Sequence, residues 1–169
     1  MLENNADPTI TRTSDGYTAY DIAIQSKRLI NAAIILEASV IYGMIHDIPE
    51  LVISSIRKGA YVNVRSSGGW NSLHYATVKG DITYIQELIT LGADVNHVEN
   101  DGWSPLHFAA YDGRDDIVQL LLDHGGEVSI MTEAGLSALD MAVAQGHSKV
   151  MEILEKRMVE ASEGPKVEL

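Results

Sequence analysis

The apolar residues in the second half of the chain recur with the spacing of short helices. Between residues 101 and 126, Leu106, Ala109 and Ala110 fall at positions i, i+3 and i+4, which lie on one face of a helix. Ile117 to Leu122 form the broad apolar face of a second helix, and glycines follow both segments. Neither helix is long enough to bury much apolar surface alone, so we expect the two to pack against further copies of the same unit.

The same pattern returns at an offset of 33 residues. The shared columns are Gly69, Gly102 and Gly135; Leu73, Leu106 and Leu139; Ala76, Ala109 and Ala142; Gly80, Gly113 and Gly146; Leu88, Leu121 and Leu154. Each unit opens with a turn signal such as Asp101-Gly102, since glycine accepts positive φ. Ser104 then offers a helix cap, and Pro105 fits the first helical position. We therefore predict repeats at 68–100 and 101–133 and a C-terminal capping repeat at 134–160.

These units resemble the ankyrin repeat. The resemblance rests on two phrases: Ser104-Pro105-Leu106-His107-Phe108-Ala109-Ala110, and Leu91-Gly92-Ala93-Asp94-Val95-Asn96. It implies an all-α repeat solenoid in which helix-turn-helix pairs are joined by β-turn fingers. It also implies that His74 and His107, in the capping motif, hydrogen-bond the backbone of a neighbouring repeat rather than bind a metal.

The N-terminal part departs from this pattern. A closing phrase recurs at residues 58–63, with a helix before it at 49–57 and an expected first helix from Ser39 to His46. A repeat start is visible at residues 15–23, with Thr18 and Asp21 as a possible capping box. About 13 residues are missing between this start and Gly69, relative to two full periods of the repeat. We expect the end of a truncated repeat or an N-terminal cap at 1–14, two degenerate helix pairs at 15–67, and a flexible tail at 161–169.

Charge and composition disfavour nucleic acid and membranes as partners. The net charge is −12, and residues 68–160 hold fifteen acids against five bases. This segment would repel nucleic acid and favours a basic or neutral partner, although an acidic surface also serves solubility. The chain has no cysteine, no signal-peptide pattern and no apolar run that could span a membrane. We expect an intracellular, cytoplasmic protein without nucleic-acid or membrane contacts.

No catalytic or cofactor motif is visible. The sequence lacks a phosphate-binding G-x-x-x-x-G-K-[ST] loop, an esterase G-x-S-x-G turn and an H-E-x-x-H zinc motif. Asp112, Asp115 and Asp116 cluster without the spacing of a calcium loop, which favours a solvated edge. We expect no cofactor, no metal and no enzymatic activity.

The resemblance places partner contacts on the finger tips and the exposed face of each first helix. Five of the ten aromatic residues fall at these positions, and apolar and acidic residues lie beside them. The predicted partner-binding residues are Trp70, Tyr75, Val78, Lys79, Glu99, Asp101, Trp103, Phe108, Tyr111 and Asp112. Trp103, Phe108 and Tyr111 are the expected central anchors, because Trp and Tyr dominate binding hot spots.

An aromatic floor with an acidic rim suits a partner protein that presents apolar anchors beside Lys or Arg. The chain would then act as an adaptor, inhibitor or targeting subunit, and a monomer is favoured. Two alternatives stay open. In the first, the tryptophans pack against neighbouring fingers and do not contact a partner. In the second, the solenoid is a structural segment of a longer or oligomeric protein, and another domain or a second copy covers its groove.

Overall fold

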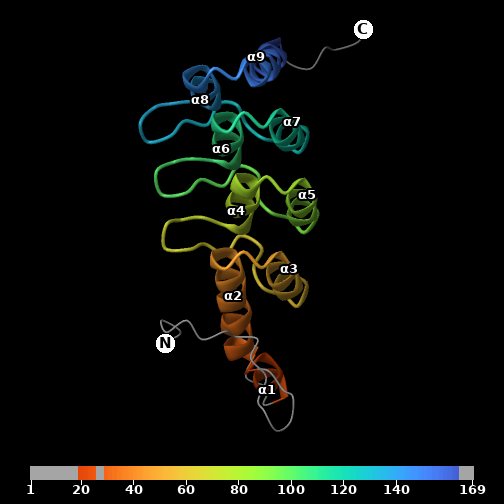
Figure 1. Cartoon of the computed structure of the whole chain (residues 1–169). Coiled ribbons are helices and arrows are strands. Elements are labelled where there is room, and N and C mark those ends of the chain that lie inside the picture. Colours follow the sequence, from red (N-terminus) through yellow and green to blue (C-terminus); the bar gives the residue numbers. More distant parts are fainter. Residues whose placement is uncertain (1–18, 26–28, 164–169) are drawn as a thin grey trace.

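The computed structural model describes residues 19–25 and 29–163, which form nine helices, and eight of them stack in two columns (Figure 1). The first column holds α2 (Leu29–Ile45), α4 (Ser72–Lys79), α6 (Pro105–Tyr111) and α8 (Ala138–Gln145). The second holds α3 (Pro49–Arg57), α5 (Ile82–Thr90), α7 (Asp115–Asp123) and α9 (Ser148–Glu163). Long loops, the fingers, extend from the first column away from the second. The predicted all-α repeat solenoid is confirmed.

Capping residues and glycines set the helix boundaries, and the predicted residues Ser104, Pro105 and Gly80 are among them. Ser104 precedes α6 in an extended conformation, and Pro105 occupies the first turn. Asn71 caps α4 through its side chain, which accepts a hydrogen bond from the backbone N–H of His74. The helix ends at Gly80, whose φ of +74° is readily adopted only by glycine.

One continuous apolar core runs through the stack. Of the aligned leucines, Leu73, Leu106, Leu121 and Leu154 are almost completely buried, whereas Leu139 is partly buried; the aligned alanines Ala76, Ala109 and Ala142 are buried. The alanines lie on first helices, where a small side chain lets the next first helix approach closely. The repeats therefore stabilise one another by stacking, as the 33-residue period predicts.

The N-terminal region differs from the expectation. We expected a first helix from Ser39 to His46, but α2 begins ten residues earlier, at Leu29, and is continuous. No proline lies between Leu29 and Ile45, and the finger that would separate two helices is missing there, so nothing interrupts the helix. Residues 15–67 thus contain three helices in their described part, because α2 packs against both α1 (Ala19–Gln25) and α3.

The ends of the chain add two details. The expected cap at residues 1–14 and the possible capping residue Thr18 lie outside the described residues. Residues 161–163 belong to α9 rather than to a tail, so the described helix extends past the predicted boundary at 160. No helix in the described part is long and apolar enough to cross a membrane.

Candidate partner-binding surface

Two buried histidines fix the fingers to the first helices. The Nε2–H of His74 donates to the carbonyl of Trp103 in the next finger, 3.1 Å away, while its Nδ1 accepts from the N–H of Asn71. His107 repeats the arrangement 33 residues later, with its Nε2 3.2 Å from the carbonyl of Leu136. The predicted structural role of both histidines is confirmed. Burial lowers the pKa of His74 to about 4 and also lowers the pKa of His107, so both rings are neutral at pH 7.

The finger that carries Trp103 is held by a buried carboxylate. Glu99 is 7% exposed, and its Oε1 accepts the N–H groups of Asp101 and Trp103, each at 3.0 Å. Neighbouring fingers are joined by backbone, since the N–H of Glu133 donates to the carbonyl of Asp101. The placement of Glu99 on an exposed acidic rim was therefore wrong. Its charge serves the turn, because two backbone donors would otherwise lack a partner.

The five predicted aromatic residues form one connected cluster. Its ring-to-ring contacts run in the order Tyr75, Trp70, Phe108, Trp103 and Tyr111, with centroid separations of 5.2, 4.8, 4.9 and 5.8 Å. The first and last contacts are edge-on, a favourable geometry for aromatic pairs. We call these five residues the aromatic cluster. Because Trp70 packs on Phe108 of the following repeat, the cluster couples two repeats.

Exposure separates the members of this cluster. Tyr111 is 43% exposed, whereas the other four rings are half-buried. Val78, which occupies the position equivalent to Tyr111 on the preceding first helix, is 44% exposed. The rings of both tryptophans pack on Phe108 of α6, whereas Tyr111 and Val78 stay open to solvent.

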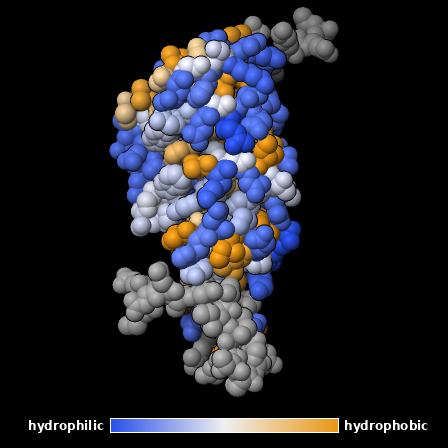
Figure 2. Space-filling view, in the orientation of Figure 1, coloured by the Kyte–Doolittle hydropathy of each residue, from blue (hydrophilic) through white to orange (hydrophobic). Residues whose placement is uncertain are grey.

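The charged residues beside the aromatic cluster differ in how freely they could contact a partner. Asp101 and Asp112 are exposed, as the predicted rim requires. Lys79 pairs with Asp47 at 2.7 Å, but both side chains are more than half exposed, so the pair contributes little stability and can exchange partners. The face seen in Figure 2 is mainly hydrophilic, with separate apolar patches.

We define the front surface as the predicted positions without Glu99. It consists of Trp70, Tyr75, Val78, Lys79, Asp101, Trp103, Phe108, Tyr111 and Asp112. The described residues contain no group of three or more metal-ligating side chains placed to hold an ion. What this surface offers is an apolar and aromatic contact area with carboxylates at its edge.

The two columns of helices and the fingers define the chain as a helical repeat solenoid. A family model described as ankyrin repeats (3 copies) matches residues 34–132 and 73–162. The chain therefore belongs to the ankyrin-repeat family, whose repeats are generally protein–protein interaction modules and typically non-catalytic. The comparison with curated proteins finds no match.

Proposed function

We propose that this chain is a non-catalytic module that binds a segment of a partner protein on the front surface. The single observation that carries the proposal is the state of Tyr111. The ring is well exposed, yet its edge-on contact with Trp103 holds it in place. A side chain that is ordered before binding loses little conformational entropy when a partner covers it.

The surroundings of Tyr111 favour a particular partner chemistry. Val78 supplies a second exposed apolar contact at the equivalent position of the preceding repeat, and Asp112 follows Tyr111 directly in the chain. A partner segment with apolar anchors beside Lys or Arg complements this pairing, and the charge of −10 over residues 68–160 would also speed its association. Roles as an adaptor, an inhibitor or a targeting subunit all use binding of this kind.

Capture from cell lysate tests this proposal. Wild-type chain, Tyr111→Ala and Tyr61→Ala would be immobilised, and the retained proteins identified by mass spectrometry. Tyr61 is 61% exposed and lies outside the front surface, so it controls for the loss of an exposed tyrosine. We expect a partner that the wild type and Tyr61→Ala retain and Tyr111→Ala loses, with equal circular dichroism spectra. Equal retention by all three would refute the assignment of the site.

An assembly role is the second candidate, and a different observation favours it. Ile30 and Ile34 on α2 are 78% and 54% exposed, one helical turn apart, so they form an apolar stripe at the N-terminal end of the stack. Another domain or a second copy would bury such a stripe. Sedimentation equilibrium over a hundredfold concentration range tests for self-association. A molar mass that rises with concentration for the wild type, but not for the Ile30→Ser, Ile34→Ser double variant, would support this role.

A further inference from the structure

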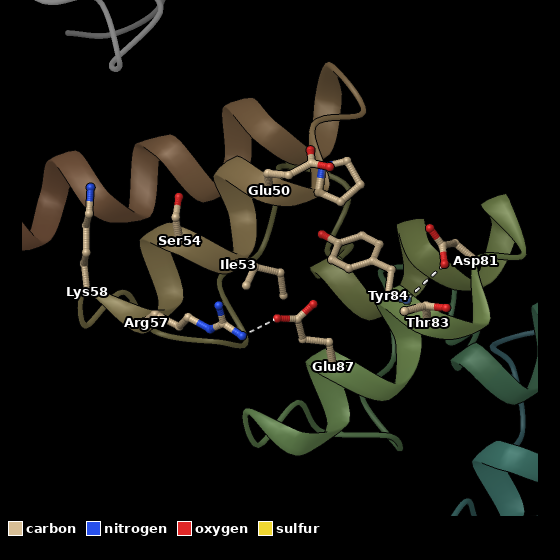
Figure 3. A pocket seen from close by; sticks show the side chains of 10 residues that line it. Glu50, Ile53, Ser54, Arg57, Lys58, Asp81, Thr83, Tyr84 and Glu87 are labelled. Carbon is tan, nitrogen blue, oxygen red and sulfur yellow. Dashed lines mark hydrogen bonds and ion pairs between the residues drawn. The ribbon is translucent and has the colours of Figure 1, made fainter.

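A concave site lies on the second column of helices, between α3 and α5 (Figure 3). We call it the outer cleft. Its volume is about 570 Å³, and its lining includes Glu50, Ile53 and Arg57 from α3 and Asp81 and Tyr84 from the α5 side. None of these residues belongs to the front surface, so the cleft is independent of the proposed function.

Tyr84 is the unusual residue of this cleft. The next two repeats place Ile117 and Val150 at the equivalent position, and both are fully buried aliphatic side chains. Tyr84 is only 9% exposed, yet Figure 3 shows its hydroxyl directed into the cleft. The hydroxyl finds no hydrogen-bond partner within the described part of the chain, and it reaches solvent there. Packing alone does not call for a hydroxyl, because the other repeats use hydrocarbon.

Both signs of charge line the cleft: the carboxylates are Glu50, Asp81 and Glu87, and the cations are Arg57 and Lys58. Burial, followed by the carboxylates of Asp47, Asp81, Glu50 and Glu87, raises the pKa of Tyr84. The four carboxylates that oppose a phenolate would stabilise a cation at the same place.

Two of the four carboxylates are already neutralised by ion pairs, and two are not. Arg57 lies 2.6 Å from Glu87, and Lys79 lies 2.7 Å from Asp47. Glu50 and Asp81 have no ion-pair partner among the described residues, although Asp81 caps α5 by accepting the N–H of Tyr84. Both acids would favour their helix starts in any case. The buried phenol between them is the feature that helix capping does not explain.

We propose that the outer cleft binds a lysine or arginine side chain of a partner protein. The aliphatic stem would lie on Ile53 and the Tyr84 ring, and the charged head would lie beside Glu50, with Asp81 at the backbone end of Tyr84. The Tyr84 hydroxyl oxygen would accept a hydrogen bond from the head group. Arg57 and Lys58, at the other end of the cleft, repel a cation and so fix the direction in which the side chain enters.

An NMR titration of the full-length, ¹⁵N-labelled chain tests this proposal. The probes are the capped tripeptides acetyl-Ala-Lys-Ala-amide and acetyl-Ala-Arg-Ala-amide, with the norleucine tripeptide as a neutral control of the same length. We expect saturable amide shifts around Ile53 and Tyr84 with at least one basic peptide. The norleucine peptide should bind about tenfold more weakly or not at all, because it lacks the charge. Failure of both basic peptides to shift these amides would overturn the proposal, and so would equal binding of the neutral one.

Three variants assign the binding to its residues. Tyr84→Phe removes only the hydroxyl, and Glu50→Gln removes only a charge at an exposed position, so both should fold. Each should weaken the basic peptide about threefold or more. Glu155→Gln on α9 removes the same charge outside the cleft and should leave the affinity unchanged. Equal losses for Glu50→Gln and Glu155→Gln would show that only net charge matters, which would refute the site. The Tyr111→Ala variant should bind these peptides like the wild type, so a failure here is separate from a failure at the front surface.

Discussion

Acidification should destabilise this chain through His74 in particular. The pKa of His74 is about 4 in the folded state, and its ordinary value is 6.5. As the pH falls below about 6.5, the unfolded chain binds the proton and the folded chain does not, so stability is lost between these two values. At pH 5 the two pKa values correspond to a loss of about 2 kcal/mol relative to pH 7.5. The structural reason is that the His74 ring is fully buried, and burial disfavours the charged imidazolium.

Urea unfolding at pH 7.5 and pH 5.0 measures this loss. The fluorescence of Trp70 and Trp103 reports on the two repeats that His74 joins. His74→Gln does not titrate, so it should lose about 2 kcal/mol less than the wild type between the two pH values. The exposed His124 provides a matched control, and His124→Gln should lose as much stability as the wild type. If wild type and His74→Gln lost equal stability, the reasoning from the buried ring would be refuted.

Three further substitutions test the packing. Leu121→Ala should lower the free energy of unfolding in urea by about 2–5 kcal/mol, because this side chain is fully buried. Leu120→Ala should lower it by about half as much, because Leu120 is only partly buried. Equal losses would mean that the buried face of α7 is misassigned. Glu99→Ala should cost about 1–3 kcal/mol by thermal denaturation, because two finger N–H groups lose their acceptor, and an unchanged melting curve would contradict that role. Gly102→Ala should be more destabilising than Gly135→Ala, since both have positive φ but only the former meets backbone within 3 Å; similar melting temperatures would exclude the clash.

The repeats were predictable because their signals are local. A turn glycine, a capping residue and helical apolar spacing occur together every 33 residues, and each acts within a few residues of its own position. The length of α2 was not predictable in this way. Its sequence is apolar on nearly all sides, so periodicity does not show where one partner helix ends and the next begins. Only the packing against both α1 and α3 explains the single long helix.

The members of the aromatic cluster were predictable from the sequence, but their exposure was not. The family pattern identified all five aromatic residues, yet the burial of Trp70 against Phe108 depends on how two repeats stack. Glu99 was misassigned because charged residues are usually exposed. Comparison of the repeats indicated a role in the turn. Thr132 lies 33 residues after Glu99, and its hydroxyl likewise accepts a backbone N–H, that of Leu136. Tyr84 was not singled out from the sequence, although the next two repeats have the aliphatic residues Ile117 and Val150 at the equivalent position.

The most direct test of the front surface is the affinity of the captured partner, measured by isothermal titration calorimetry. The variants are Tyr111→Ala and, as the exposed-tyrosine control, Tyr61→Ala. We predict that Tyr111→Ala weakens binding by about 2 kcal/mol or more, roughly thirtyfold, at an unchanged melting temperature. Tyr61→Ala should bind within about twofold of the wild type. An affinity for Tyr111→Ala equal to that of the wild type would contradict the proposal that partners dock on this surface.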